Sequence, residues 1–342
     1  MWYNRRMKIA FFELFKEEQG VLAGQFSEQK TSYSEEKLTK ENVASYRESE
    51  VVSVFVNSII DKEIIDLLPN LKFINTSSTG FDHIDIGYCA AKGIKVSNVP
   101  AYGSITVAEF TFALLLALSR KIFQAVHQLR EEGDFSFSKL EGFNLNGKTI
   151  GVLGTGKIGK NVIRIAKGFG MKVLAFDPHP DLSFARELNF EYQDLEKIIS
   201  GAEILTLHAP YSKENHHLIN KERISLMKKG VYLINTARGE LIDTNALIWG
   251  LKEGIIAGAG LDVLEGEREL KDEKEIFASQ EKVERVKDYK ILLEDKMLID
   301  LPNVLITPHI AFYSKEAENK IIEVTIENIK SFLAGTPQNL VQ

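Results

Sequence analysis

The sequence of 342 residues contains a single cysteine, Cys89, so the chain cannot form an intrachain disulfide. A lone thiol in an apolar stretch fits a reducing compartment and predicts a buried, inert side chain. The longest apolar run, residues 110–118, is too short to span a bilayer, and no apolar stretch with a small-residue cleavage site follows the first arginines. These absences predict a cytoplasmic protein.

An excess of positive charge is also missing. The chain has 42 lysines and arginines against 48 aspartates and glutamates, a formal net charge of -6. Nucleic acids and membrane surfaces select proteins with clustered positive charge, so the sequence predicts neither as a partner. A small anionic substrate is not excluded, because it responds only to the local field of its pocket.

Short apolar segments alternate with helix-length segments along almost the whole chain, which is typical of parallel sheets covered by helices on both faces. About ten such strands exceed what one compact sheet of this kind commonly holds, so we expect two sheets in two domains. The predicted strands are 8–12, 51–56, 73–76, 94–97, 149–153, 172–176, 204–207, 231–235, 257–261 and 304–306.

Two breaks divide these strands between domains. The first is the proline-containing segment 99–103, followed by a long helix that opens with a Thr-x-x-Glu capping box at 106–109. The second is 307–309, after which comes a final helix with no strand behind it. The expected domains are residues 1–103 plus 310–342, and residues 104–309.

Two segments have an open interpretation. The helix that opens at Thr106 is apolar nearly all round, so more than one surface must cover it. It is either a core helix that bridges the domains or a subunit interface. Residues 268–300 are mostly charged, with helical propensity and no strand signal, and we interpret them as a surface insertion near the mouth of the site.

A glycine-rich turn opens the second domain's first βα unit. The predicted strand 149–153 runs directly into Gly154-Thr155-Gly156-Lys157-Ile158-Gly159, and a helix-forming stretch follows. In dinucleotide-binding turns the first glycine permits the tight turn, the second lets the backbone approach the pyrophosphate and the third allows close helix packing. The helix amino terminus, at Lys157 and Ile158, then offers free N–H donors to the phosphates.

An acidic residue stands where such a turn needs one. The next predicted strand ends at Asp177, at the spacing of about 20 residues where a carboxylate binds the ribose hydroxyls. The same carboxylate repels the 2′-phosphate of NADP, and the nearest downstream arginine, Arg186, lies beyond two prolines. The sequence therefore predicts NAD as the cofactor.

Three kinds of reactive side chain follow strands of the second domain. Arg238 follows one strand, and a guanidinium there can bind a carboxylate through two hydrogen bonds and polarise a neighbouring keto oxygen. His309 follows another strand and can exchange a proton near neutral pH. An acid beside that histidine would hold its tautomer, and both Glu265 and Glu267 follow a third strand.

Several motifs occur in order along the chain: SSTGFDHID at 77–85, VPAY at 99–102, the glycine turn, MKKGVYLINTARGELID at 227–243 and TPHIA at 307–311. Over essentially the whole length they resemble the D-2-hydroxyacid dehydrogenase family, most of all its D-lactate dehydrogenase branch. The resemblance implies two doubly wound parallel-sheet α/β domains, a Rossmann cofactor domain at 104–309 and a flavodoxin-like substrate domain, with the active site in the cleft between them.

The resemblance also implies roles for the reactive side chains. Arg238 binds the substrate carboxylate and keto oxygen, and His309 donates the proton as hydride arrives from the nicotinamide. The supporting acid lies five residues after Asp262, which selects Glu267 over Glu265. Asp262 itself is expected at the nicotinamide end of the cofactor.

Further binding residues follow from the same resemblance. The cofactor is expected to contact one loop at His208, Ala209 and Pro210 and another at Thr236 and Ala237. For His208 a structural hydrogen-bonding role is the alternative.

On the substrate side, Thr79 and Gly80 are expected to offer main-chain N–H groups to the substrate carboxylate, unless they form an ordinary strand-end turn. Tyr102 is expected to line the pocket and Tyr313 to cap the substrate side chain.

The adjacent histidines His216 and His217 look like a metal pair only superficially, since neighbouring residues on a helix or strand do not converge on one ion. No other acid–histidine cluster in the sequence has metal-ligand spacing, so the sequence predicts no metal.

Together these features predict an NAD-dependent D-2-hydroxyacid dehydrogenase that reduces a 2-keto acid, with pyruvate favoured, to the D-2-hydroxy acid. Reductases of the hydroxyisocaproate, phenyllactate, glycerate or phosphoglycerate type are alternatives within the family. A dehydrogenase-like protein that senses NAD(H) is an alternative of another class. The expected partners are the small acid and a second copy of the chain, bound as a homodimer through the helix near Thr106.

Overall fold

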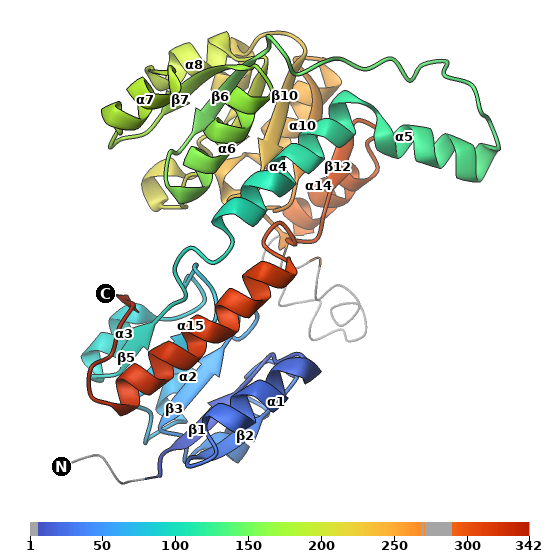
Figure 1. The fold of residues 1–342 in the computed structure, drawn as a ribbon. Helices are drawn as coiled ribbons and strands as arrows, with labels where there is room; N and C mark the ends of the chain where they lie inside the picture. Colours follow the sequence, from blue (N-terminus) through green and yellow to red (C-terminus); the bar gives the residue numbers. More distant parts are fainter. Residues whose placement is uncertain (1–5, 268–269, 271–288, 342) are drawn as a thin grey trace. The chain divides into compact units, whose positions relative to one another are not determined.

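The computed structural model describes residues 6–267, 270 and 289–341 (Figure 1). These residues divide into two compact units. The first unit contains the chain up to Gly103 together with the segment from Ser314 onward, and the second runs from Ser104 to Tyr313. The chain therefore leaves the first unit once and returns to it at its carboxyl end.

A six-stranded sheet forms the centre of the first unit, in the order β13-β5-β4-β3-β1-β2. Its neighbouring strands are parallel except for β13 against β5. Without β13 the order is 2-1-3-4-5, which is the flavodoxin-like order expected for the substrate domain. The strands are β1 (Lys8–Phe11), β2 (Lys30–Tyr33), β3 (Val51–Val54), β4 (Phe73–Thr76), β5 (Lys95–Ser97) and β13 (Leu340–Val341). The helices are α1 (Lys16–Gln25), η1 (Val43–Tyr46), α2 (Lys62–Asp66), α3 (Ile86–Ala91) and α15 (Lys315–Leu333).

Two strands of this sheet are not predicted from the sequence. β2 lies at the sheet edge and reads Lys-Thr-Ser-Tyr, so it lacks the apolar run that marks a buried strand. β13 is two residues long and follows the last helix, which corrects the expectation that no strand comes after that helix.

Helix α15 packs on the sheet of the first unit. The ring of Phe332 stacks on Phe73 of β4, with centroids 4.4 Å apart and planes at 7°. Asn328 donates a hydrogen bond from Nδ2 to Oδ1 of Asn75, also on β4, at 3.0 Å. These long-range contacts explain why the carboxyl-terminal helix belongs to the first unit.

A seven-stranded, entirely parallel sheet forms the second unit, in the order β12-β11-β10-β9-β6-β7-β8. The order reverses between β6 and β9, as it does in the Rossmann fold, where ligands bind outside the carboxyl ends of the strands at that point. The strands are β6 (Thr149–Leu153), β7 (Lys172–Phe176), β8 (Glu191–Tyr192), β9 (Ile204–Leu207), β10 (Val231–Asn235), β11 (Ile256–Leu261) and β12 (Val304–Ile306). The helices are α4 (Ser104–Ser119), α5 (Ile122–His127), η2 (Gln128–Glu132), α6 (Lys157–Gly168), α7 (Leu182–Leu188), α8 (Leu195–Gly201), η3 (Lys213–Asn215), α9 (Lys221–Leu226), η4 (Gly239–Leu241), α10 (Thr244–Lys252) and α14 (Tyr289–Ile299).

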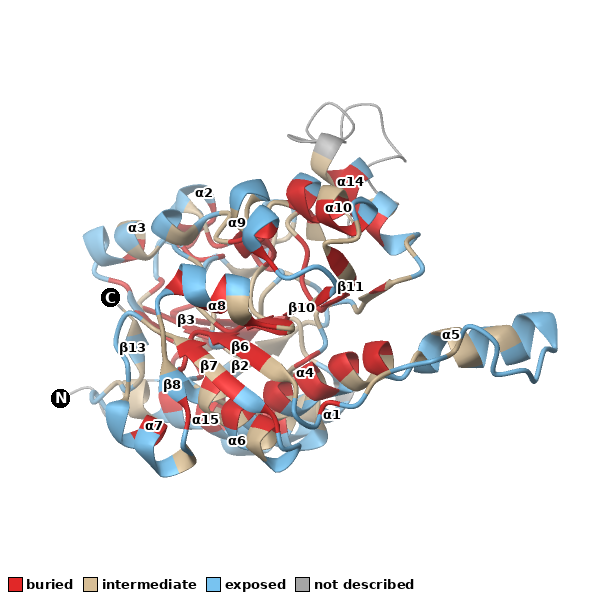
Figure 2. Ribbon diagram, turned by 90° about the horizontal axis from the view of Figure 1, so that it is seen from above, coloured by how far each residue is buried: buried red, intermediate tan, exposed pale blue. Residues whose placement is uncertain are grey.

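Two apolar layers cover the faces of this second sheet (Figure 2). Ile150 and Val152 of β6 point into the layer under α4, α6 and α7, and Leu205 and Leu207 of β9 point into the layer under α8, α9 and α10. All four side chains are fully buried. Since each such side chain contributes about 1.5–3 kcal/mol when buried, the two layers set the position of every strand end that carries a site residue.

Helix α4 is part of the core of the second unit. Ala108 and Leu115 are fully buried. A Cβ placed on Gly260 of β11 would lie 3.1 Å from the Cβ of Leu114, so the helix approaches the sheet closely. The buried face of α4 therefore belongs to the core of the second unit, and a subunit contact through its remaining surface stays a prediction. Although α4 is strongly apolar, no helix in the described part of the chain is long and apolar enough to cross a bilayer.

The segment after β12 stays with the second unit for four residues beyond the boundary expected at 310. The reason is Asp262, whose carboxylate accepts hydrogen bonds from the N–H groups of Ile310 at 3.0 Å and Ala311 at 2.8 Å. A hydrogen bond between residues so distant in the sequence leaves no local sequence signal. The boundary expected at 310 therefore falls four residues before the end of the second unit.

The charged segment 268–300 lies partly outside the described residues, which omit 268–269 and 271–288. Its described end is helix α14, where Leu292, Leu298 and Asp295 are buried. One face of this helix is therefore packed into the second unit, while Leu293, Met297 and Ile299 on the same helix are exposed, as expected for a helix at the surface.

Candidate active site

The glycine turn between β6 and α6 has the geometry that the sequence predicts. Gly154 has a φ of +95°, and a Cβ there would lie 2.7 Å from the backbone of His208 and Ala209. A Cβ on Gly159 would lie 2.0 Å from the carbonyl oxygen of Gly154. Gly156 differs, because no atom lies within 4 Å of its Cβ position. Packing thus requires the first and third glycines, and the second faces open space.

That open side coincides with the amino terminus of α6. Gly156 is the N-cap residue and no side chain caps the helix, so the first N–H groups, including those of Lys157 and Ile158, have no partner within the helix. These donors and the positive end of the helix dipole suit a phosphate. The residues present therefore fit a dinucleotide pyrophosphate.

Asp177 at the end of β7 is held against the glycine turn. Its Oδ2 accepts hydrogen bonds from the N–H of Thr155 at 2.6 Å and from the Thr155 hydroxyl at 3.0 Å, and its Oδ1 accepts one from the N–H of His179 at 2.9 Å. The Thr155 hydroxyl also lies 2.9 Å from the hydroxyl of Tyr192. The turn thus orients the carboxylate that is predicted to bind the ribose. Thr155 and Tyr192 carry no sequence signal for this supporting role.

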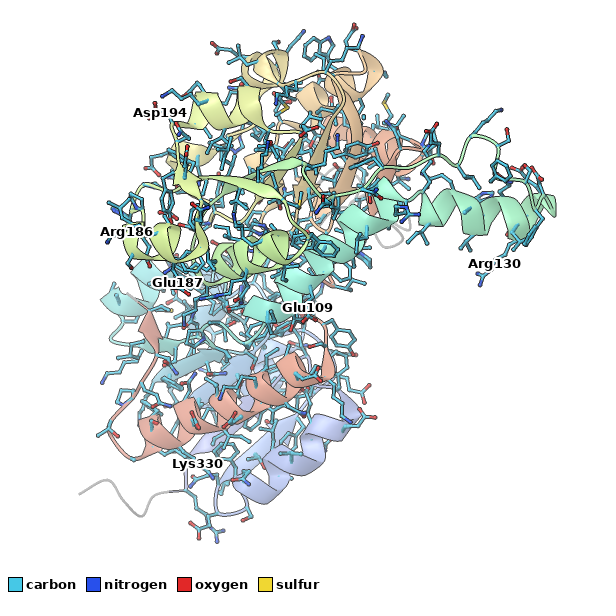
Figure 3. All side chains as sticks on the ribbon, turned by 45° about the horizontal axis from the view of Figure 1, so that its top comes forward. Glu109, Arg130, Arg186, Glu187, Asp194 and Lys330 are labelled. Atoms are coloured by element: carbon cyan, nitrogen blue, oxygen red, sulfur yellow. The ribbon has the colours of Figure 1, made fainter. Side chains whose placement is uncertain are left out.

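Among the described residues, no lysine or arginine forms an ion pair or hydrogen bond with the Asp177 carboxylate. Lys160 forms an ion pair with Asp181 at 2.6 Å. Arg186 is exposed on α7, on the outer side of the unit (Figure 3). This arrangement agrees with the preference for NAD inferred from Asp177.

The side chain of His208 is buried. Its Nε2 lies 2.9 Å from the hydroxyl of Thr206, and its backbone N–H donates to the carbonyl of Leu153 at 2.7 Å. Burial lowers the pKa of the imidazole to about 3, so the ring is neutral at physiological pH. The contact at Nε2 fits the hydrogen-bonding role considered for His208, and its contact with the cofactor stays a prediction. The backbone at His208 and Ala209 meanwhile lies against Gly154, and Pro210 follows at the surface.

The loop that carries Arg238 is shaped by Asn235, the last residue of β10. Buried Asn235 accepts a hydrogen bond from the N–H of Ala237 at 3.0 Å and donates one to the carbonyl of Arg238 at 2.8 Å. The hydroxyl of Thr236 lies 3.0 Å from that of Thr111 on α4. The half-buried guanidinium of Arg238 donates to the carbonyl of Ala237 at 2.8 Å. Sequence reasoning does not identify Asn235 as the residue that organises this loop.

The next residue brings two loops into direct contact. A Cβ on Gly239 would lie 2.1 Å from the carbonyl carbon of Leu264, so only glycine lets the Arg238 loop pack on the loop after β11. That second loop carries Asp262, Glu265 and Glu267. Arg238 and the acidic residues 262, 265 and 267 therefore lie on two loops whose backbones are in van der Waals contact.

Asp262 ties the loop after β11 to the segment after β12. Its carboxylate is 1% exposed and accepts hydrogen bonds from the Thr307 hydroxyl at 2.5 Å and from the N–H groups of Ile310 and Ala311. Burial raises the pKa of this carboxyl, and the hydrogen bonds oppose that rise. The structure thus gives Asp262 an anchoring position beside His309, and its contact with the nicotinamide end stays a prediction.

His309 and Glu267 form a hydrogen-bonded pair. Nδ1 of His309 lies 2.9 Å from Oε1 and 3.2 Å from Oε2 of Glu267, and each side chain is about 30% exposed. His309 has a left-handed φ of +55°, and its N–H donates to the carbonyl of Asp262 at 2.9 Å. With Nδ1 on the carboxylate, Nε2 on the opposite edge of the ring is left to face a reactant. The pair can therefore deliver or accept one proton at a defined nitrogen.

Glu265, the rival for the acid's position, has other partners. Its Oε1 lies 2.8 Å from Nε2 of His217 and its Oε2 accepts a hydrogen bond from the Thr244 hydroxyl at 3.0 Å. Of the two acids weighed in the sequence, Glu267 is the one that the structure places on His309.

The predicted substrate-binding residues of the first unit form a shaped loop after β4. The hydroxyl of Thr79 donates to the carbonyl of Val99 at 2.9 Å and accepts from the N–H of Ala101 at 3.3 Å. The carbonyl of Gly80 accepts from the Ser78 hydroxyl at 2.6 Å. These bonds fit a strand-end turn and leave the substrate role of Thr79 and Gly80 as a prediction.

The two predicted pocket tyrosines fall in different units. Tyr102 is half-buried in the first unit, and Tyr313 is 49% exposed at the end of the second. Tyr313 contacts the ring of Phe312 edge to face, with centroids 5.9 Å apart. Their roles toward a substrate stay predictions.

Known proteins resemble this chain over most of its length. Residues 112–311 match the D-isomer specific 2-hydroxyacid dehydrogenase family, in its NAD-binding domain. The D-lactate dehydrogenase of Escherichia coli K12 is 37% identical over 310 residues, 89% of this chain and 90% of that protein. The aromatic 2-oxoacid reductase of Clostridium sporogenes ATCC 15579 is 40% identical over 292 residues, 84% of each chain. The solved structure of Aquifex aeolicus D-lactate dehydrogenase complexed with NAD and lactic acid has a TM-score of 0.86 and 36% identity, and the match covers 96% of both chains.

A Rossmann sheet with a dinucleotide turn and a paired histidine defines a nicotinamide-dependent oxidoreductase. The chain belongs to the D-isomer specific 2-hydroxyacid dehydrogenase family, which confirms the family predicted from its motifs. It is an NAD-dependent D-2-hydroxyacid dehydrogenase.

Proposed function

We propose that this dehydrogenase reduces a small 2-keto acid to the D-2-hydroxy acid and that pyruvate is its preferred substrate. The observation that carries the proposal is the His309–Glu267 pair at 2.9 Å, in which Glu267 lies on the loop after β11 whose backbone packs against that of the Arg238 loop. Reduction of a 2-keto acid requires a proton donor such as a histidine and a cationic group, such as an arginine, that binds the substrate carboxylate.

Each residue has a distinct part in this chemistry. Arg238 binds the substrate carboxylate and polarises the keto oxygen, because a planar guanidinium can donate to both. His309 gives its Nε2 proton to that oxygen, and Glu267 compensates the positive charge that the protonated imidazole carries. NAD, when bound in its reduced form, supplies the hydride. Main-chain N–H groups at Thr79 and Gly80 give the carboxylate a second set of donors.

The choice of pyruvate rests on the resemblance to the D-lactate dehydrogenase branch. Relatives of similar identity carry different substrate names, D-lactate dehydrogenase in one case and aromatic 2-oxoacid reductase in another. Tyr102 and Tyr313 are the proposed side-chain contacts of the substrate.

The experiment is a substrate panel. Oxidation of NADH is followed with pyruvate, 2-ketobutyrate, 2-ketoisocaproate, phenylpyruvate, hydroxypyruvate and glyoxylate, and kcat/KM is compared. We expect pyruvate to give the highest value and D-lactate to be the product. A higher kcat/KM for phenylpyruvate or 2-ketoisocaproate would make that acid the preferred substrate in place of pyruvate. No turnover with any of the six acids would contradict the proposed activity.

We also propose a homodimer, with a revised contact surface. The sequence predicts it through the helix near Thr106, but the apolar residues of α4 are largely covered by its own unit. The segment directly after α4 is different: α5 and the chain behind it project from the second unit (Figure 1) and expose Phe123, Phe135 and Phe137 to 57%, 90% and 91%. Apolar surface of this kind is typical of subunit contacts.

Light scattering after size exclusion tests the dimer. The wild type is expected at twice the chain mass, and the double variant Phe135→Ser/Phe137→Ser is expected to shift toward monomer. A monomeric wild type would contradict the proposal, and a variant that stays fully dimeric would move the interface elsewhere.

A further inference from the structure

Besides the His309–Glu267 pair, the described part of the second unit holds a second group of histidine and carboxylate side chains. It consists of His216 and His217, in the turn after η3, and Glu265, in the loop after β11. One ligand atom from each residue lies within 4.8 Å of the other two. Neither the proposed reaction nor the proposed dimer uses this cluster.

The backbone explains why adjacent histidines converge here. In a helix or strand neighbouring side chains point in different directions, and the sequence alone therefore argues against a shared ion. His217, however, has a left-handed φ of +52°, and its N–H is held by the carbonyl of Glu240 at 2.9 Å. The two imidazole rings consequently stack, with centroids 3.8 Å apart and planes at 24°. Because the two histidines lie in a turn, their side chains converge, contrary to the expectation for neighbouring residues in a helix or strand.

The charges around the rings favour a cation. Nε2 of His217 lies 2.8 Å from Oε1 of Glu265, and its Nδ1 lies 3.9 Å from Oδ2 of Asp243. Two carboxylates thus surround one imidazole. His216 is exposed, so an ion can enter from solvent, while the side chain of Glu265 is only 12% exposed and is also held by Thr244.

We propose that His216, His217 and Glu265 bind one divalent ion of the zinc class. Two imidazoles and a carboxylate are donors that suit zinc rather than magnesium or calcium, and three protein ligands leave a fourth position for water. Bonds of about 2.1 Å in a tetrahedron place ligand atoms about 3.4 Å apart. The ligand atoms of the cluster lie within 4.8 Å of one another and those of His217 and Glu265 only 2.8 Å apart, so His216 has to approach and the His217–Glu265 pair has to open slightly. The exposed ring of His216 can make that movement.

The cluster has a simpler structural interpretation, which the test has to separate. The His217–Glu265 pair alone can anchor the loop after β11, and in that case His216 has no part in it. Binding of an ion at this cluster, in contrast, requires both His216 and His217. His216 is therefore the discriminating residue, and because it is exposed its substitution leaves the fold intact. The site does not depend on which 2-keto acid the enzyme reduces.

The experiment measures zinc binding by isothermal titration calorimetry of the full chain, without an affinity tag and after treatment with a chelator. We expect one Zn²⁺ for each chain. His216→Ala and Glu265→Gln should each weaken binding by more than about tenfold, since loss of a ligand exceeds the tenfold or larger cost of losing a second-shell partner. His179→Ala, at another exposed histidine on the loop after β7, is the matched control and should bind like the wild type.

Two results would overturn the proposal. One is the absence of zinc binding to the wild type. The other is unchanged affinity in His216→Ala, which would place the ion elsewhere, for example on His309. Thermal unfolding of His216→Ala should match the wild type, so that a loss of binding is not a loss of fold. Should Glu265→Gln unfold, His216→Ala still decides the question.

Discussion

The fully buried carboxylate of Asp295 on α14 accepts a hydrogen bond from the N–H of Gly266 at 3.0 Å, one residue before Glu267. A Cβ on Gly266 would lie 2.7 Å from the same carboxylate oxygen, so helix and loop are in close contact. On the other side Glu265 is held by a histidine and a threonine. These contacts hold the loop on both sides of Glu267 and so help to position its carboxylate beside His309.

Removing the carboxylate of Asp295 should lower the rate as well as the stability. Asp295→Ala leaves the Gly266 N–H without its acceptor, which costs about 1–3 kcal/mol of unfolding free energy. It also frees the backbone beside Glu267, and a misplacement of about 1 Å in an active site can cost about 10²-fold in rate. We expect kcat to fall by about tenfold or more, with the KM for NADH unchanged.

The neighbouring Glu294→Ala is the matched control, because Glu294 is also buried and on α14 but accepts a hydrogen bond from Asn245 at 2.8 Å. It should lose stability without losing kcat. Equal values of kcat in the two variants would show that Asp295 supports only the fold.

The two acids of the loop after β11 should separate in kinetics. Glu267→Gln removes the charge that faces Nδ1 of His309, and we expect kcat to fall by about 10²-fold, within the range of general acid–base contributions. Glu265→Gln should change kcat less than threefold in metal-free buffer (about 0.6 kcal/mol), because its partners are His217 and Thr244. Steady-state rates at saturating NADH provide the measurement, and a larger loss in the Glu265 variant would exchange the two roles.

Asp177 should control the choice between NADH and NADPH. The wild type is expected to prefer NADH, and Asp177→Ser should raise the KM for NADH and narrow the ratio of kcat/KM for the two cofactors, since the repelling charge is gone. Asp194→Ser removes an exposed carboxylate of the same unit (Figure 3) and should leave the ratio unchanged. A wild type that prefers NADPH would contradict this account of Asp177.

His208 should make the fold sensitive to acid. The folded protein keeps this imidazole neutral, with a pKa of about 3, whereas the unfolded chain takes up a proton near the ordinary value of 6.5. The contribution is therefore fully present above pH 6.5 and is lost as the pH falls from there toward 3. Between pH 7 and pH 5 the loss amounts to about 2 kcal/mol of unfolding free energy.

Denaturant unfolding at pH 7 and pH 5 tests this. His208→Gln has no group to protonate, so its stability should fall less between the two pH values than that of the wild type, by about 2 kcal/mol. His179→Gln, at an exposed histidine, should follow the wild type. Identical pH dependence in wild type and His208→Gln would mean that His208 is protonated in the fold.

The parts of the site that the sequence predicts are those with local signals. Gly154, Gly156 and Gly159 follow an apolar strand and precede a helix and Asp177, and this context indicates a dinucleotide turn. The residues Arg238 and His309 likewise follow apolar runs. Their approximate positions at the carboxyl edge of the sheet follow from the βα rhythm.

The parts that the sequence does not predict depend on contacts between distant residues. The bond from Gly266 to Asp295 and the support of Asp177 by Thr155 join residues more than 20 positions apart. Asn235 acts locally, but its role depends on the shape of the loop and not on its place in the motif. The edge strand β2 is not predicted because its residues are polar. The stacking of His216 and His217 is not predicted because nothing in the sequence indicates the left-handed backbone conformation of His217.

The central claim is that His309, paired with Glu267, supplies the proton in the reduction of a 2-keto acid. The most direct test is a single-turnover measurement of NADH oxidation by His309→Gln with saturating pyruvate, together with the affinity for NADH from fluorescence. We predict that the rate falls by about 10²–10⁴-fold while the affinity for NADH stays within about twofold of the wild type. An unchanged rate, or a rate lost together with NADH binding, would contradict the claim.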